Sequence, residues 1–215
     1  LGSSLLLPRS CTQLDLSFNE LGPEGAMALA LAIAVCASLT SLNLSGNKKL
    51  GDTGTRSVVQ ALSACTSVRE LNLSDCKGLT SLGLEKLCDC VSLEILWLSG
   101  CSSLVSLPDL GRCVLLKYLR LEECVALTSL PDSLGGCVAL EWLSLNGCSQ
   151  LTSLPETLGG CVALRTLDLM RCSGLVSLPD LSGLKQLHKG ILPHVFDVEA
   201  VATWEEHGRK AFSVR

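Results

Sequence analysis

One short pattern recurs along most of the chain: Leu-x-x-Leu-x-Leu, followed three residues later by Asn or Cys. Its central leucine returns every 23 to 29 residues, at Leu14, Leu42, Leu71, Leu96, Leu119, Leu143 and Leu167. A unit this short cannot bury its apolar face alone, so successive units have to stack and share one continuous core. The repeat therefore predicts a solenoid in which each unit supplies one short strand, a turn and a return segment.

The period and the consensus resemble those of leucine-rich repeat proteins. Residues 14–29, LDLSFNELGPEGAMAL, are similar to the ribonuclease-inhibitor class of these repeats. Residues 143–155, LSLNGCSQLTSLP, resemble instead the repeats of plant intracellular immune receptors of the nucleotide-binding leucine-rich class. The resemblance implies an α/β leucine-rich repeat solenoid, with a curved parallel sheet on the concave side and helices, then short turns, on the convex side. For function it implies protein recognition in the cytosol.

The return segments change character along the chain. Residues 25–36 and 53–65 are long enough for helices, and the second segment places Val58, Val59 and Leu62 at helical spacing. From residue 104 onward the return shrinks to Ser-Leu-Pro-Asp/Glu followed by Leu-Gly in most units. Proline blocks a continuous helix, so we expect short turns or one-turn helices there.

The repeat divides the chain into three parts. Residues 1–10 are predicted to be a partial preceding repeat or an N-terminal edge, residues 11–187 the repeat domain of seven units, and residues 188–215 a C-terminal tail. Within the tail, residues 197–210 follow an amphipathic pattern, with Val198, Val201 and Trp204 on one face and Asp197 as the N-cap. This predicted helix either caps the solenoid or docks on another chain.

The thirteen cysteines follow the repeat rather than a framework of bridges. One ladder closes the strand motif, where the first two units carry Asn19 and Asn47: Cys76, Cys101, Cys124, Cys148 and Cys172. A second ladder precedes each new strand: Cys36, Cys65, Cys90, Cys113, Cys137 and Cys161. We interpret both as structural, with each S–H meeting backbone carbonyls of the adjacent coil. A zinc site is not expected, since Cys88 and Cys90 have no histidine near them in the sequence.

The composition favours a protein partner. The net charge is only -4 and no basic stripe is present, so we expect no nucleic acid. The apolar run at 26–39 is too short to span a bilayer and predicts a buried return helix, without membrane insertion. The chain starts at Leu1 without an initiator Met, which leaves a removed targeting peptide and a missing start both open. Regularly buried, unpaired cysteines indicate an intracellular protein, in the cytoplasm or in an organelle.

The candidate binding site comes from the strand positions that face the concave side. Of the four Trp and Tyr residues, three fall on this face in consecutive units: Trp97, Tyr118 and Trp142. With Ile95 they predict one contiguous apolar area, because neighbouring strands lie about 4.8 Å apart, and Arg120 can stack over Trp97. A mixed-charge rim completes the predicted protein-binding residues: Glu94, Lys117 and Glu141. The concave face of the first three units is small and polar, and no hot spot is expected there.

No catalytic or cofactor motif accompanies this face. Gly46 and Gly51 have the Walker spacing, but Asp52 occupies the lysine position and would repel phosphate. All three histidines lie in the last 28 residues, so the repeats offer no general base. We therefore expect neither enzyme activity nor a cofactor or metal.

Two functions stay open from the sequence. The first is a non-catalytic protein-interaction module that binds a protein partner through the concave face. The second is an accessory structural subunit of a large stable assembly, held by its N-terminal edge and its C-terminal helix.

Overall fold

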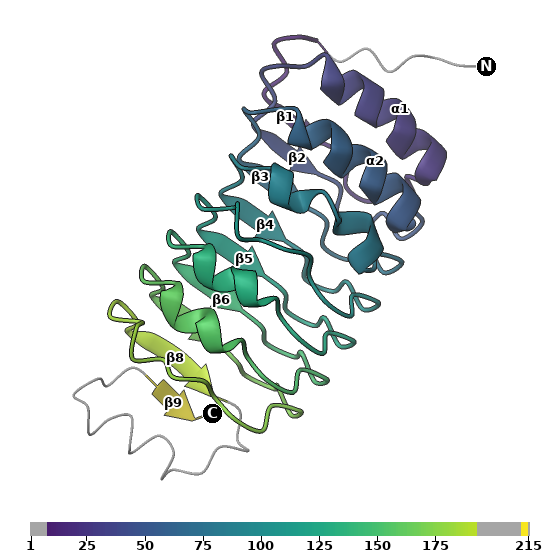
Figure 1. The fold of residues 1–215 in the computed structure, drawn as a ribbon. Helices are drawn as coiled ribbons and strands as arrows, with labels where there is room; N and C mark the ends of the chain where they lie inside the picture. Colours follow the sequence, from purple (N-terminus) through teal and green to yellow (C-terminus); the bar gives the residue numbers. More distant parts are fainter. Residues whose placement is uncertain (1–7, 193–211, 215) are drawn as a thin grey trace.

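A computed structural model of the chain describes residues 8–192 and 212–214. Nine strands form one open parallel sheet in chain order, each strand pairing with the next (Figure 1). The strands are β1 (Gln13–Asp15), β2 (Ser41–Asn43), β3 (Glu70–Asn72), β4 (Ile95–Trp97), β5 (Tyr118–Arg120), β6 (Trp142–Ser144), β7 (Thr166–Asp168), β8 (Lys189–Leu192) and β9 (Phe212–Val214). The predicted solenoid is confirmed.

The register places the central leucines of all seven units in one row across the sheet, from Leu14 opposite Leu42 to Leu143 opposite Leu167. From Leu42 onward these side chains are completely buried, whereas Leu14 in the edge strand is half-buried. One continuous core therefore runs the length of the solenoid, as the stacking of short units requires.

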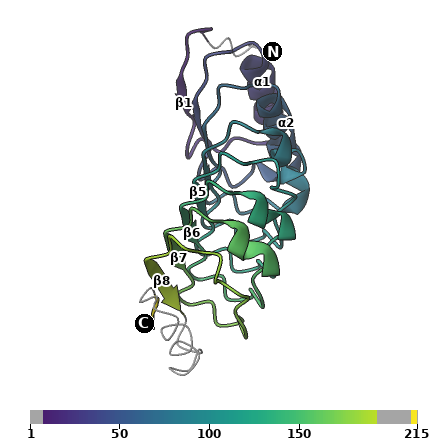
Figure 2. The ribbon, with the colours of Figure 1, turned by 60° about the vertical axis from the view of Figure 1, so that its left-hand side comes forward.

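On the side opposite the strands, α-helices cover the first coils and short single-turn helices follow in later ones (Figure 2). The α-helices are α1 (Pro23–Ala34) and α2 (Gly51–Ser63), which confirms both predicted helices, and α2 buries Val58, Val59 and Leu62. The later returns contain only short 3-10 turns: η1 (Ser81–Leu84), η2 (Leu87–Asp89), η3 (Asp132–Gly136) and η4 (Glu156–Gly160). The extended Pro131 and Pro155 precede η3 and η4, so proline limits these returns to short turns as expected.

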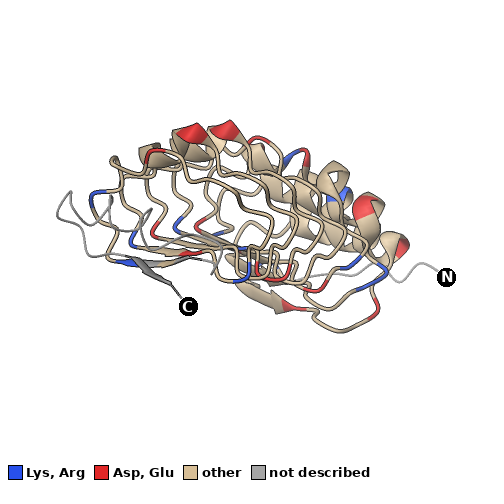
Figure 3. Cartoon of the chain, turned by 90° about the horizontal axis from the view of Figure 1, so that it is seen from below, with Lys and Arg blue, Asp and Glu red and all other residues tan. Residues whose placement is uncertain are grey.

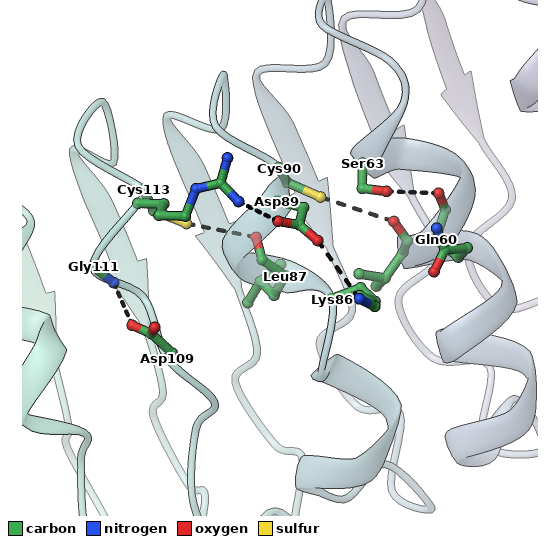
Figure 4. Close-up of polar contacts among 11 residues, drawn as sticks. Gln60, Ser63, Lys86, Leu87, Asp89, Cys90, Asp109, Gly111 and Cys113 are labelled. Carbon is green, nitrogen blue, oxygen red and sulfur yellow. Dashed lines mark hydrogen bonds and ion pairs between the residues drawn. The ribbon is translucent and has the colours of Figure 1, made fainter.

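The cysteines form hydrogen-bonded ladders between coils. In the first ladder, each thiol donates to a leucine carbonyl of the preceding coil, as from Cys124 Sγ to Leu98 O at 3.2 Å. Asn47 fills the same place with stronger bonds, from Nδ2 to Leu16 O and Leu44 O, both at 2.8 Å. In the second ladder Cys113 Sγ donates to Leu87 O at 3.6 Å (Figure 4). The predicted contacts with the adjacent coil are confirmed.

Burial lowers the reactivity of the thiols deep in the core. It raises the pKa of Cys113 and of Cys124 to about 12, because the thiolate would lose its solvation inside the core. None of the thirteen cysteines, all within residues 8–192, is in a disulfide. A cysteine with so high a pKa is almost wholly protonated at neutral pH, so the ladders act through packing and hydrogen bonding.

The sheet continues past residue 187, where the sequence predicts the repeat domain to end. β8 pairs with β7, and Gly190 lies opposite Leu167 in the row of central leucines. The strand was missed because Gly190 breaks the leucine pattern there. The predicted tail helix at 197–210 and residues 1–7 lie outside the described residues, so the three-part division of the chain stays a prediction. No helix of the described part is long and apolar enough to cross a bilayer.

Candidate protein-binding surface

Three adjacent strands bring the predicted aromatic residues together. Ile95, Tyr118 and Trp142 lie opposite one another in one row of β4, β5 and β6. Trp97 lies opposite Arg120 in the parallel row on the other side of the central leucines. We call these five residues the aromatic patch.

Arg120 lies between the two tryptophans of the aromatic patch. Its guanidinium carbon is 5.2 Å from the ring centroid of Trp97 and 5.9 Å from that of Trp142. The contact with Trp97 confirms the predicted stacking, and both distances are within the range of a cation–π interaction. Trp142 was not predicted as a second partner, because it lies in the other row and is reached only through the length of the arginine side chain.

Lys189 adds a cation to the same surface. Its Nζ lies 5.8 Å from the ring centroid of Trp142, across the buried Thr166 of β7. The sequence placed residue 188 and those after it in the tail, so Lys189 was missed. The repeat itself carried the signal, since Lys189 follows Thr166 by one repeat period of 23 residues.

The patch is only partly open to solvent. Tyr118 is 36% exposed, while Ile95, Trp97, Arg120 and Trp142 are half-buried against one another. Trp142 Nε1 is buried and has no hydrogen-bond partner among the described residues. An unpaired buried donor lowers the stability of the folded state by about 1–3 kcal/mol. The packing of the Trp142 ring and its contacts with Arg120 and Lys189 have to offset that loss.

Alternating charges border the patch at the start of the strands. Glu94 Oε2 pairs with Lys117 Nζ at 2.7 Å and Glu94 Oε1 with Arg69 Nε at 3.8 Å. Glu141 pairs with Arg165 at 3.7 Å. Glu94 raises the pKa of Lys117 by hydrogen bonding and by charge. These pairs are partly exposed, so each contributes at most about 1 kcal/mol to stability.

This charged row extends the predicted rim of Glu94, Lys117 and Glu141 by an arginine at each end. Basic and acidic residues both occur along the strand side of the coils (Figure 3). Such a mixed border influences the orientation of a partner more than the strength of binding.

The comparisons with known proteins agree with this fold. One family model, described as a leucine-rich repeat, matches residues 12–30, 35–58 and 64–88, and a second such model matches residues 139–161. No curated protein matches the sequence. The chain is a leucine-rich repeat protein. The likeness to the ribonuclease-inhibitor class and to plant immune receptors stays a prediction.

Solved structures with the same architecture share little sequence with the chain. The Arabidopsis receptor kinase HAESA, in complex with the peptide hormone IDA and the co-receptor SERK1, is 20% identical with a TM-score of 0.52, over 95% of this chain and 35% of that one. The leucine-rich repeat domain of the type III effector XopL is 21% identical with a TM-score of 0.45, over 75% of this chain and 71% of that domain. The chain thus spans about a third of the HAESA structure, and this likeness shows the fold alone.

Proposed function

We propose that this protein is a non-catalytic interaction module that binds a protein partner through the aromatic patch. The observation that carries the proposal is the array of Trp97, Arg120 and Trp142 on one concave surface, with Tyr118 beside it. Solenoids of this kind present extended concave surfaces to their partners. Trp, Tyr and Arg are also the residue types most enriched in binding hot spots.

The energetics favour recognition over a purely structural role for these residues. A cation–π contact contributes about 0.5–1 kcal/mol at an exposed site and about 2 kcal/mol when water is excluded. A partner that covers Arg120 and the tryptophans would therefore strengthen contacts that already exist. The rings are also held in place before binding, which lowers the entropic cost of association.

A polypeptide partner is consistent with what similar folds bind. The HAESA structure contains a peptide hormone and a second protein, so this architecture accommodates polypeptides. No basic stripe is present on the described surface, and a nucleic acid would need one. We therefore assign the aromatic patch to a protein rather than to a nucleic acid.

The test is affinity capture from the native source, followed by mass spectrometry. The baits are the wild type, Trp97→Ala/Trp142→Ala and, because Tyr118 is the most exposed ring of the patch, Tyr118→Ala. We expect a specific partner to bind the double variant at least tenfold more weakly, since a hot-spot residue contributes more than about 1 kcal/mol. The matched control is Val114→Ala/Val138→Ala, which changes two exposed apolar residues outside the patch.

A chain that ends after Leu192 tests the alternative of a structural subunit. This truncation removes residues 193–215, including β9, and retains β8 together with its partner strand β7. Loss of the partner on truncation, with full capture by both patch variants, would contradict binding through the patch. Circular dichroism and thermal melting of every bait separate lost binding from lost folding.

A further inference from the structure

The concave face contains a cavity beside the aromatic patch, in the half formed by the first strands. Its volume is about 190 Å³. The lining comes from β1 to β4: Gln13, Leu14, Asp15, Ser41, Asn43, Glu70, Asn72 and Trp97. For comparison, an apolar cavity of about 150 Å³ can hold benzene, so this one is large enough for the end of a long side chain.

Two carboxylates give the cavity a negative charge that no described cation neutralises. Neither Asp15 nor Glu70 forms an ion pair among the described residues, whereas Glu94 and Glu141 on the neighbouring strands do. Asp15 accepts hydrogen bonds from Ser17 N at 2.8 Å and from Asn43 Nδ2 at 3.1 Å, and Glu70 accepts one from Ser41 Oγ at 3.0 Å. The bonds from Ser17 lower the pKa of Asp15, so this carboxylate is ionised at neutral pH.

Asn72 provides an unused donor in the same cavity. Its side chain is nine-tenths buried, and Oδ1 accepts a hydrogen bond from Ser74 N at 2.9 Å. Nδ2 has no partner among the described residues, although Asn43 Nδ2, in the equivalent position of β2, donates to Asp15. This donor is accessible from the cavity, so a ligand that brings an acceptor, such as a peptide carbonyl, can reach it.

Trp97 connects the cavity with the aromatic patch. Arg120 approaches its ring from β5, while Asn72 of β3 lies on the other side of it along the sheet. A cavity with an indole wall at one end and two carboxylates in its lining suits a planar cation, which can lie against the ring while the carboxylates supply the opposite charge.

We propose that this cavity binds a basic side chain, best an arginine, that the protein partner inserts beside the aromatic patch. The guanidinium lies between Trp97 and Glu70 of the adjacent strand, with the charge of Asp15 at the far side of the cavity, while Asn72 donates to a carbonyl of the same segment. This inference rests on the proposed function and adds the chemistry of the partner. Arginine binding in this cavity would let the polar half of the concave face contribute to specificity. The sequence predicted no hot spot in that half.

The test uses the full chain and N-acetyl-arginine amide, which carries both the cation and peptide carbonyls. Two-dimensional NMR follows the indole N–H of Trp97 and the side-chain amide of Asn72 during a titration. We expect saturable shifts with a dissociation constant on the order of 10 mM, because one side chain supplies only a small binding energy. Asp15→Asn/Glu70→Gln should weaken binding at least tenfold, and 500 mM KCl should weaken it in the wild type.

The control ligand is N-acetyl-citrulline amide, which has the same shape without the charge. Equal shifts from citrulline, unchanged binding by the double variant, or the absence of a saturable shift would each overturn the inference. Val114→Ala/Val138→Ala, which lies outside both the cavity and the aromatic patch, should leave arginine binding unchanged. If Tyr118→Ala/Trp142→Ala, changed at two patch residues outside the cavity, still captures the partner at wild-type strength while the wild type binds the arginine amide saturably, the proposed function fails and the cavity site stands.

Discussion

At the scale of single residues, two adjacent glycines in η4 have very different surroundings. A Cβ on Gly160 would lie 2.5 Å from the backbone oxygen of Gly135 in the preceding coil. A Cβ on Gly159 would meet nothing closer than Asp180 O at 3.3 Å. Because backbone atoms cannot turn aside as a flexible side chain can, Gly160→Ala forces two coils apart.

We predict that Gly160→Ala lowers the free energy of unfolding by about 1–3 kcal/mol, the usual cost of overpacking. Gly159→Ala should stay within about 1 kcal/mol of the wild type, since the lower entropy of the unfolded chain offsets a tight contact. Urea unfolding of both variants measures the difference. Equal losses would mean that helix geometry, and not the approach of the coils, requires glycine at position 160.

The binding residues were predictable from the sequence only as far as strand register determines them. Equivalent positions of successive units lie opposite each other in a parallel sheet, so the repeat predicted Trp97 beside Arg120. The structure has these two residues as neighbours. The contact of Arg120 with Trp142 depends on side-chain rotamers, which no repeat pattern specifies. The cavity was missed for a similar reason: small polar residues do not reveal which carboxylates and amides are left without a partner.

At the scale of elements, the cysteine ladders make the stability of the fold depend on pH. The folded pKa of Cys124 is raised to about 12 by burial, against about 8.5 in an unfolded chain. Below about pH 8.5 both states keep the proton, and the stabilisation is fully present. At higher pH the unfolded state loses its proton first, so stability falls until the folded thiol also titrates near pH 12.

We therefore predict that the free energy of unfolding decreases steeply above about pH 8.5, with each buried thiol contributing about 1 kcal/mol per pH unit. Cys124→Ala should lower the slope by that amount, whatever its effect on stability at neutral pH. Urea unfolding in the presence of a reductant at pH 8.0, 9.0 and 9.5 provides the slopes. Val125→Ala, a neighbouring exposed position without a titrating group, is the matched control. An unchanged slope for Cys124→Ala would contradict the assignment.

The return segments were predictable because proline and segment length decide between helix and turn. Both α-helices follow from the sequence, and so do the short turns at Pro131 and Pro155, where proline prevents a longer helix. β8 could not be predicted in this way, because Gly190 stands where each of the seven predicted units has its central leucine. Backbone pairing with β7 maintains the strand without that side chain.

At the scale of the whole molecule, the described strands form an open array in chain order. Among the described residues each strand pairs only with its neighbours in the sequence, and α1 and α2 pack on each other in the same order. Stability in such an array is approximately a sum over units and their interfaces. A coil in the middle is covered on both sides, whereas among the described residues β1 has a strand on one side only, and Leu14 in it is half-buried.

Native-state hydrogen exchange should therefore show protection that falls from the middle toward β1. We predict that the amide of Leu98, bonded to Arg120 O at 2.9 Å, exchanges only when several coils open together. The amide of Leu16, bonded to Asn43 O at 2.8 Å, should exchange through fraying that costs at least about 1–2 kcal/mol less.

Two variants test this gradient of stability. Leu14→Ala should speed exchange in β1 alone. Leu119→Ala, in the fully buried centre, should destabilise the middle coils by about 2–5 kcal/mol. Equal exchange rates of the Leu16 and Leu98 amides would show instead that all coils unfold as one unit. The interfaces between coils would then be strong enough to couple the edge strand to the centre.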